Sequence, residues 1–138
     1  MPQYGKRSHN NLSTCSGEII HIFTNVIQEI DNSVIFGHRT PEKQFELYKK
    51  GRELIDGHWT QVDSVVTTKD GYNLLSYHNH YPSLAIDVVP YPGLYEADRE
   101  QFYELAGVIK STAKLLGYEI YWGQDLWGWD LAHWQLRE

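Results

Sequence analysis

Residues 76–89, Ser-Tyr-His-Asn-His-Tyr-Pro-Ser-Leu-Ala-Ile-Asp-Val-Val, indicate more about the fold than any other stretch of the chain. The run from Leu84 to Val89 is apolar and partly β-branched, and Pro90-Tyr-Pro-Gly93 follows it directly, so it predicts a buried strand. Strand alternation places Asp87 between apolar residues on one face. A carboxylate in such surroundings is costly to bury without a partner. Asp87 is therefore either paired within the core or a metal ligand.

Histidines near this strand and near the end of the chain favour a metal site. His78 and His80 lie in the loop just before the strand, and His133 follows Asp130 in a short alternating run that predicts a terminal strand. Residues three apart point to opposite faces of a strand, so Asp130 and His133 reach one site only if Asp130 lies in a bend. The glycine in Trp127-Gly-Trp129 favours such a bend. Otherwise Asp130 caps the strand and His133 packs among the tryptophans.

Three helices and a few short strands are predicted around the central strand. Thr40-Pro41 opens one helix and Gly51 closes it, with Phe45 and Tyr48 on its buried face and Leu47 at the margin. The other two helices, which show apolar residues at helical spacing, are 16–30 and 97–116. Further strands are expected at 33–37, 118–122 and 131–137.

Two segments lack a regular pattern. Residues 1–15 are polar and irregular, and residues 52–75 predict a long loop or excursion. Helices and short strands in this order predict an α+β fold, in which a small, mainly antiparallel sheet packs with about three helices. At 138 residues, we expect one domain over residues 1–138.

Composition and charge exclude several classes of protein. With 41% hydrophobic and 14% aromatic residues, the chain is too apolar for a disordered protein. Its net charge of −6 argues against a nucleic-acid binder, and no apolar run approaches the length of a membrane span. Cys15 is the only cysteine, which excludes an intrachain disulfide and a cysteine-rich metal site. The first nine residues lack the apolar core of a signal peptide, so we expect a soluble cytosolic monomer.

An arginine precedes the predicted helix that opens at Thr40-Pro41. Arg39 in this position could clamp a carboxylate or stabilise an oxyanion. This pattern alone is weak, because surface arginines are common. Catalytic zinc usually takes three protein ligands from His, Asp and Glu and keeps a fourth position open. The acid and histidine motifs together therefore predict a catalytic zinc site.

These motifs, taken in order, resemble the zinc peptidoglycan peptidases of the D-alanyl-D-alanine carboxypeptidase family, and above all the phage endolysins that act as L-alanyl-D-glutamate peptidases. The family pattern is an Arg-Ser/Thr helix opening with a downstream Gln, then Ser-x-His and Ala-x-Asp, then Trp-Gly, and a closing Asp-x-x-His. The matching residues are Arg39-Thr40 with Gln44, Ser76-Tyr-His78 with Ala85-Ile-Asp87, Trp122-Gly123, and Asp130-Leu-Ala-His133. Tyr4-Gly-Lys-Arg-Ser8 and Val89-Pro-Tyr91-Pro also look like the phage branch. The resemblance covers nearly the whole chain and implies a Hedgehog/DD-peptidase-like fold.

The resemblance implies a role for each matched residue. His78, Asp87 and His133 would bind Zn²⁺. His80 is the alternative to His78, because the commonest family spacing places the histidine seven residues before the aspartate, where His80 stands. The remaining roles concern catalysis and substrate: Asp130 would be the base, Arg39 would hold substrate or stabilise negative charge, and Gln44 and Ser76 would contact substrate.

The implied activity is metal-assisted hydrolysis of an amide bond in the peptidoglycan stem peptide. The phage branch indicates the L-alanyl-D-glutamate bond, cleaved by an endolysin during phage lysis. Two alternatives stay open: a carboxypeptidase that removes terminal D-alanine, and a non-catalytic cell-wall-binding module on the same fold. An endolysin of this kind would accumulate in the cytoplasm of the host bacterium and act on the cell wall after release.

Overall fold

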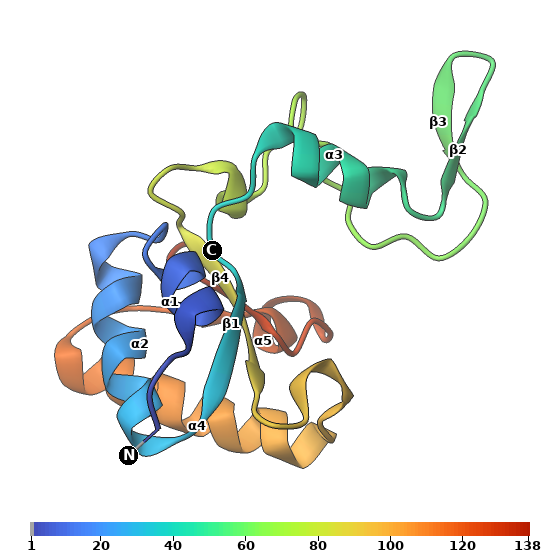
Figure 1. Ribbon diagram of the computed structural model, residues 1–138. Helices are drawn as coiled ribbons and strands as arrows, with labels where there is room; N and C mark the ends of the chain where they lie inside the picture. The colour runs from blue at the N-terminus through green and yellow to red at the C-terminus, as the bar shows by residue number, and fades with distance from the viewer. Residues whose placement is uncertain (1) are drawn as a thin grey trace.

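A four-stranded antiparallel sheet lies at the centre of the protein, whose residues 2–138 are described by a computed structural model. Its strand order is β1-β4-β6-β5, and every neighbouring pair is antiparallel. The strands are β1 (Asn32–Phe36), β4 (Ala85–Pro90), β5 (Tyr121–Trp122) and β6 (His133–Gln135). The predicted α+β class with an antiparallel sheet is thus confirmed (Figure 1).

Two long helices form the main core together with the sheet. They are α2 (Gly17–Glu29) and α4 (Arg99–Leu116), which contact each other (Figure 1). The buried residues of α2 recur every three or four positions, as an amphipathic helix requires. Helix α4 begins with a capping box between Asp98 and Gln101 and ends at Gly117, whose φ of 83° is left-handed. Both helices agree with the prediction.

The central strand β4 separates the core from the candidate site. Ile86 and Val88 are fully buried in the same cluster as the apolar residues of α2 and α4. Because successive side chains of a strand point to opposite faces, Asp87 faces away from this core. The strand predicted from Leu84 to Val89 therefore has the alternation that the sequence indicated.

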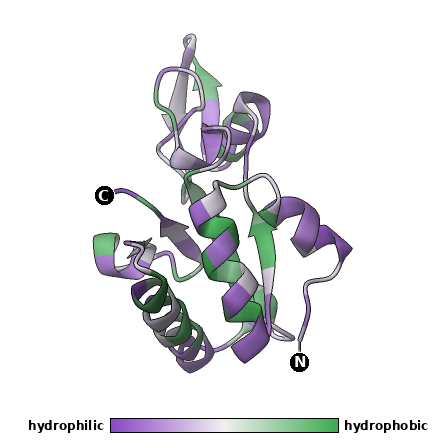
Figure 2. Cartoon of the chain, turned by 90° about the vertical axis from the view of Figure 1, so that its left-hand side faces the viewer, coloured by the Kyte–Doolittle hydropathy of each residue, from purple (hydrophilic) through white to green (hydrophobic). Residues whose placement is uncertain are grey.

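The segment between β1 and β4 leaves the body of the protein as a projecting arm (Figures 1 and 2). The arm contains α3 (Pro41–Lys49) and a hairpin of β2 (Arg52–Ile55) and β3 (His58–Gln61). The hairpin is missing from the prediction for this region, which expected a long loop or excursion. Its signal is Asp56-Gly57, with φ values of 50° and 79°, a dipeptide that favours two-residue hairpin turns.

The buried face of α3 differs from the prediction. Gln44 and Leu47 are the buried residues of this helix, whereas Phe45 and Tyr48 are only partly buried. Phe45 packs edge-on against the ring of Trp59 in the arm, at 5.7 Å between centroids. Tyr48 lies under the guanidinium of Arg52. The two aromatic residues therefore hold the arm together, and the central core lies elsewhere.

Several short helices also lie outside the prediction. They are α1 (Lys6–Leu12), α5 (Gly123–Trp127) and the 3₁₀ turns η1 (Tyr77–Asn79) and η2 (Leu94–Glu96). Helix α1 has no apolar period, because Leu12 is its only buried residue. It is held instead by the Asn11 amide, which donates to the carbonyls of Val34 at 2.9 Å and Ile35 at 3.1 Å. Within residues 2–138, no helix combines the length and apolarity needed to cross a membrane.

Candidate metal centre

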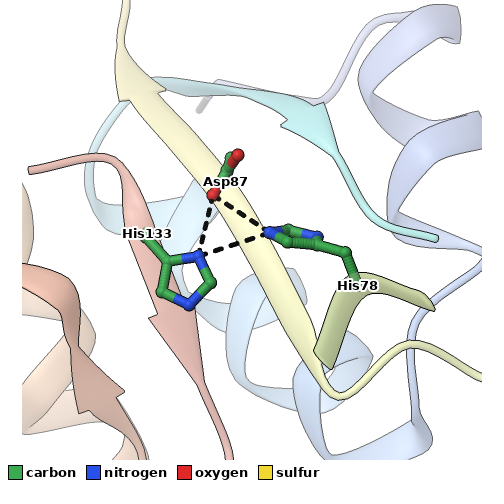
Figure 3. Close-up of side chains that lie close together, drawn as sticks. All are labelled: His78, Asp87 and His133. Atoms are coloured by element: carbon green, nitrogen blue, oxygen red, sulfur yellow. Dashed lines mark hydrogen bonds and ion pairs between the residues drawn. The ribbon is translucent and has the colours of Figure 1, made fainter. Parts of the chain in front are cut away.

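Three side chains predicted as metal ligands meet on the sheet face opposite the main core (Figure 3). Asp87 and His133 are directly paired residues of β4 and β6, and His78 reaches them from η1. His78 Nε2 lies 3.3 Å from Asp87 Oδ1 and 3.3 Å from His133 Nδ1, and the latter two atoms are 3.2 Å apart. All three side chains are buried. The structure thus brings β6 from the end of the chain to a turn and a strand that lie far from it in sequence.

The second nitrogen of each imidazole is bound to an oxygen that can only accept a hydrogen bond. His78 Nδ1 donates to the carbonyl of Gly37, and His133 Nε2 donates to Gln135 Oε1, both at 2.8 Å. The amide nitrogen of Gln135 donates to a backbone carbonyl at 2.6 Å, which fixes the orientation of this amide. The lone pairs of His78 Nε2 and His133 Nδ1 therefore point, together with Asp87 Oδ1, toward one position.

This arrangement fits a zinc ion. Three acceptor atoms in contact repel one another unless a cation lies between them. Tetrahedral zinc, with bonds of about 2.0–2.1 Å to nitrogen and oxygen, has ligand–ligand edges of roughly 3.3–3.4 Å. The separations of 3.2–3.3 Å in the cluster match this length. Two imidazoles and one carboxylate, with hydrogen bonds that orient the imidazoles, are also a donor set typical of catalytic zinc.

The electrostatics of the cluster agree with this donor set. Burial lowers the pKa of His78, so this imidazole stays neutral. Burial opposes ionisation of Asp87, but its contacts with His78 and His133 hold the pKa of this carboxyl well below its usual range. For His133, burial also disfavours the charged form, but the hydrogen bond with Asp87 raises its pKa. A proton on His133 is therefore the competitor that a metal must displace.

The geometry places His78, and not His80, in the cluster. The Ser76 hydroxyl accepts from the backbone N–H of His78 at 3.2 Å, and Asn79 Oδ1 accepts from Ser76 N at 2.9 Å. This capping box fixes the short turn from which His78 points inward. His80 is exposed and lies outside the cluster. Ser76 thus positions a candidate ligand, and its predicted contact with substrate stays a prediction.

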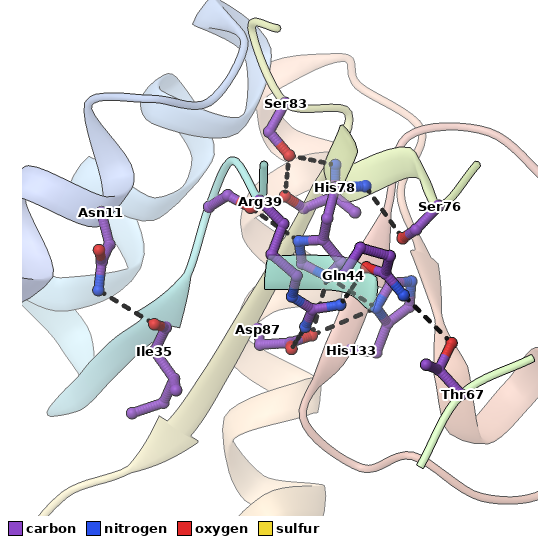
Figure 4. A network of polar contacts seen from close by, with 12 residues as sticks. Asn11, Ile35, Arg39, Gln44, Thr67, Ser76, His78, Ser83, Asp87 and His133 are labelled. Atoms are coloured by element: carbon purple, nitrogen blue, oxygen red, sulfur yellow. Dashed lines mark hydrogen bonds and ion pairs between the residues drawn. The ribbon is translucent and has the colours of Figure 1, made fainter. Parts of the chain in front are cut away.

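Arg39 and Gln44 form a largely buried polar relay behind the candidate ligand Asp87 (Figure 4). Arg39 Nη2 donates to Asp87 Oδ2 at 2.9 Å, and Arg39 Nη1 donates to Gln44 Oε1 at 3.1 Å. Gln44 Nε2 continues the relay to the Lys69 carbonyl at 2.9 Å and the Thr67 hydroxyl at 3.3 Å. This amide is fully buried, and both of its ends have protein partners. Contact of Arg39 or Gln44 with substrate stays a prediction, whereas their support of Asp87 is observed.

Asp130 lies in the bend that the sequence predicted before β6. Its φ of 69° is left-handed, which aspartate tolerates better than most residues. A Cβ at Gly123 would lie 2.6 Å from Asp130 O, 3.1 Å from Asp130 Cβ and 3.2 Å from His133 Cβ. The Trp122-Gly123 motif is thus explained, because only glycine lets the bend and the ligand approach so closely. Burial, followed by the negative charge of Asp87, raises the pKa of Asp130 to about 6.

Two residues that support the candidate ligands lie outside the sequence prediction. Gln135 accepts the hydrogen bond of His133 Nε2, and its signal is the His-x-Gln spacing, which places both side chains on one strand face. Gly37 supplies the carbonyl to His78. A Cβ at Gly37 would lie 2.2 Å from Asn11 O, a contact between distant segments that no local pattern indicates.

The fold and the site define an α+β protein with a buried two-histidine, one-aspartate cluster on an antiparallel sheet. No protein-family model matches the chain, and no curated protein matches it in sequence. Among solved structures, the fold is similar to that of the L-Ala D-Glu endopeptidase ChiX of Serratia marcescens, with a TM-score of 0.69. The match covers 98% of this chain and 90% of that chain, at 20% sequence identity. The predicted DD-peptidase-like fold is therefore confirmed, and at this identity the likeness concerns the fold alone.

Proposed function

We propose that this protein is a zinc peptidase that hydrolyses an amide bond of the peptidoglycan stem peptide, most specifically the L-alanyl-D-glutamate bond. One observation carries the proposal: His78 Nε2, His133 Nδ1 and Asp87 Oδ1 converge at the edge length of a zinc tetrahedron. The fold shared with ChiX, whose name describes an L-Ala D-Glu endopeptidase, supports the choice of bond.

Each residue would have a distinct task in this reaction. Zinc held by the three ligands would supply a Lewis acid that polarises the amide carbonyl and promotes ionisation of water. Asp130 would accept the proton of the attacking water and deliver it to the leaving amine. A pKa of about 6 suits this task, because the group is ionised at neutral pH and can still accept a proton. Arg39 would hold Asp87 in position through their 2.9 Å ion pair.

Digestion of purified peptidoglycan, with and without a chelator, tests the proposal when the products are identified by mass. We expect zinc-dependent release of a stem peptide that begins with D-glutamate. Release of free D-alanine alone would assign the activity to a carboxypeptidase. Binding to the wall without any product, in a protein that lacks stoichiometric zinc, would assign the chain to wall-binding modules.

Two variants test the separate tasks of base and ligand. Asp130→Asn should keep zinc and lose hydrolysis by about 10²-fold or more, the contribution typical of a general base. His133→Ala should lose both zinc and hydrolysis. Full hydrolysis by Asp130→Asn would contradict the role assigned to Asp130.

We further propose that the enzyme acts as a phage endolysin, from the cytoplasm of the host bacterium. The resemblance of the sequence motifs to the phage branch supports this role. Expression in a bacterial host should cause lysis only when a pore-forming protein is expressed with it. Lysis at the same rate without the pore, or no lysis with it, would contradict this role.

A further inference from the structure

Two tryptophans stand exposed beside the metal centre, in the segment that joins α5 to the Asp130 bend. Trp127 and Trp129 are 47% and 57% exposed as whole residues. Gly128, with a φ of 77°, ends α5 and turns the chain between them. Their ring centroids lie 5.9 Å apart, with the planes tilted by 37°. Two adjacent indoles therefore present a broad apolar surface to solvent, a feature that commonly marks a binding site.

This aromatic platform, Trp127 and Trp129, is continuous with the groups proposed for catalysis. The ring of Trp127 lies 5.2 Å from the ring of the ligand His133, tilted by 38°. Trp129 immediately precedes Asp130, the proposed base. The platform is therefore close enough to the three ligands to contact a group next to the scissile bond of a bound substrate.

The chemistry of the stem peptide indicates which group this is. On one side of the L-alanyl-D-glutamate bond the stem carries free carboxylates and an amino group, which apolar indole faces do not match. On the other side, one alanine and one lactyl unit join the scissile bond to a sugar ring. These two units, each about as long as an amino acid, span roughly 7 Å when extended. The ring centroid of Trp127 lies 5.2 Å from that of His133, so a linker of this length is long enough to reach the platform from the ligands.

We propose that the platform is the subsite for the N-acetylmuramoyl sugar that carries the stem peptide. The inference rests on the proposed function. The sugar ring offers C–H groups to the flat indole faces, while each indole N–H can donate to a hydroxyl or acetamido oxygen. The enzyme therefore selects stem peptides that are still attached to the glycan, over free peptides of the same sequence.

Two substrates and one variant test this subsite. The substrates are the N-acetylmuramoyl stem peptide and the same peptide with an N-acetyl group in place of the sugar. For the zinc-loaded protein, kcat/KM should be about tenfold higher with the sugar, the size expected for one aromatic contact. Trp129→Ala should lower kcat/KM for the sugar-bearing substrate about tenfold and leave the other unchanged. Trp129→Phe should restore most of the preference.

The controls separate this subsite from the proposed function. The Trp129→Ala variant should bind zinc and melt at the same temperature as the parent protein. Leu115 is an exposed apolar residue on α4, and Leu115→Ala should leave kcat/KM unchanged for both substrates. Equal hydrolysis of both substrates, or an equal loss for both in Trp129→Ala, would overturn the subsite while leaving the peptidase intact. If neither substrate is hydrolysed, the proposed function fails. Calorimetric binding of the muramoyl-containing disaccharide then decides the subsite, which is refuted if Trp129→Ala binds as the parent protein does.

Discussion

Replacement of Gln44 by leucine should destabilise the protein strongly, although this residue lies in a helix of the projecting arm. Gln44 is fully buried and bridges Arg39 to the Thr67 hydroxyl and the Lys69 carbonyl. Leucine has nearly the same volume, so the change removes hydrogen bonds and leaves little cavity. The charged Arg39 donor, at 3.1 Å, and the Lys69 carbonyl, at 2.9 Å, would remain buried without this partner.

The magnitude follows from these contacts. A buried charged donor left without its partner costs about 1.5–3 kcal/mol, and the neutral groups add roughly 1–2 kcal/mol. The total of about 2.5–5 kcal/mol corresponds to a fall in melting temperature of roughly 8–15 °C for a chain of this size. Urea unfolding, followed by tryptophan fluorescence in the presence of a chelator, measures the free energy without a contribution from metal.

A matched control is Lys43→Leu on the same helix. Lys43 is exposed, and its contact with Glu46 at 3.7 Å is a surface ion pair, so this change should stay within about 0.5 kcal/mol. The reasoning is refuted if Gln44→Leu costs less than about 1 kcal/mol, because the relay would then contribute nothing beyond a surface contact.

Three further predictions concern the cluster and the core. Elemental analysis should show that His78→Ala loses stoichiometric zinc and that His80→Ala retains it, because of these two histidines only His78 lies in the cluster. The reverse result would identify His80 as the ligand. Gly123→Ala should lower zinc affinity at least tenfold, because the new Cβ would meet Asp130 O at 2.6 Å. Gly107 has open space around it, so Gly107→Ala should leave the affinity unchanged. Equal zinc affinities of the two variants in a metal titration would contradict this account. Burial raises the pKa of the Cys15 thiol from 9.0 to about 12. Between these two values the folded state retains a proton that the unfolded state loses, so the stabilising contribution of Cys15 falls as the pH rises from 9.0 toward about 12. Between about pH 8.5 and 10.5, urea unfolding should show a smaller fall in the free energy of unfolding for Cys15→Ala than for the parent chain. An equal dependence on pH in the two proteins would exclude the effect.

The sequence predicted those features that have a local signature. The periodicity of α2 and α4 and the alternation around Asp87 identified the main core, because burial of one face imposes a period on the residues. Asp56-Gly57 also had a local signature, which the prediction of a loop overlooked. The contacts of Gly37 with α1 and of Gln44 with the arm depend on segments distant in sequence, so no window of residues contains them. The choice between His78 and His80 likewise required the turn that Ser76 caps.

Because Asp87 and His133 are directly paired across β4 and β6, a metal bound between them would also affect the register of the sheet. Strand β6 has only three residues, and a slip of one residue against β4 would turn its side chains to the other face. A slipped sheet would separate the two ligands and could not bind the ion. The free energy of metal binding would therefore stabilise only the sheet with the correct strand register. The ion would then select this register as well as activate the substrate.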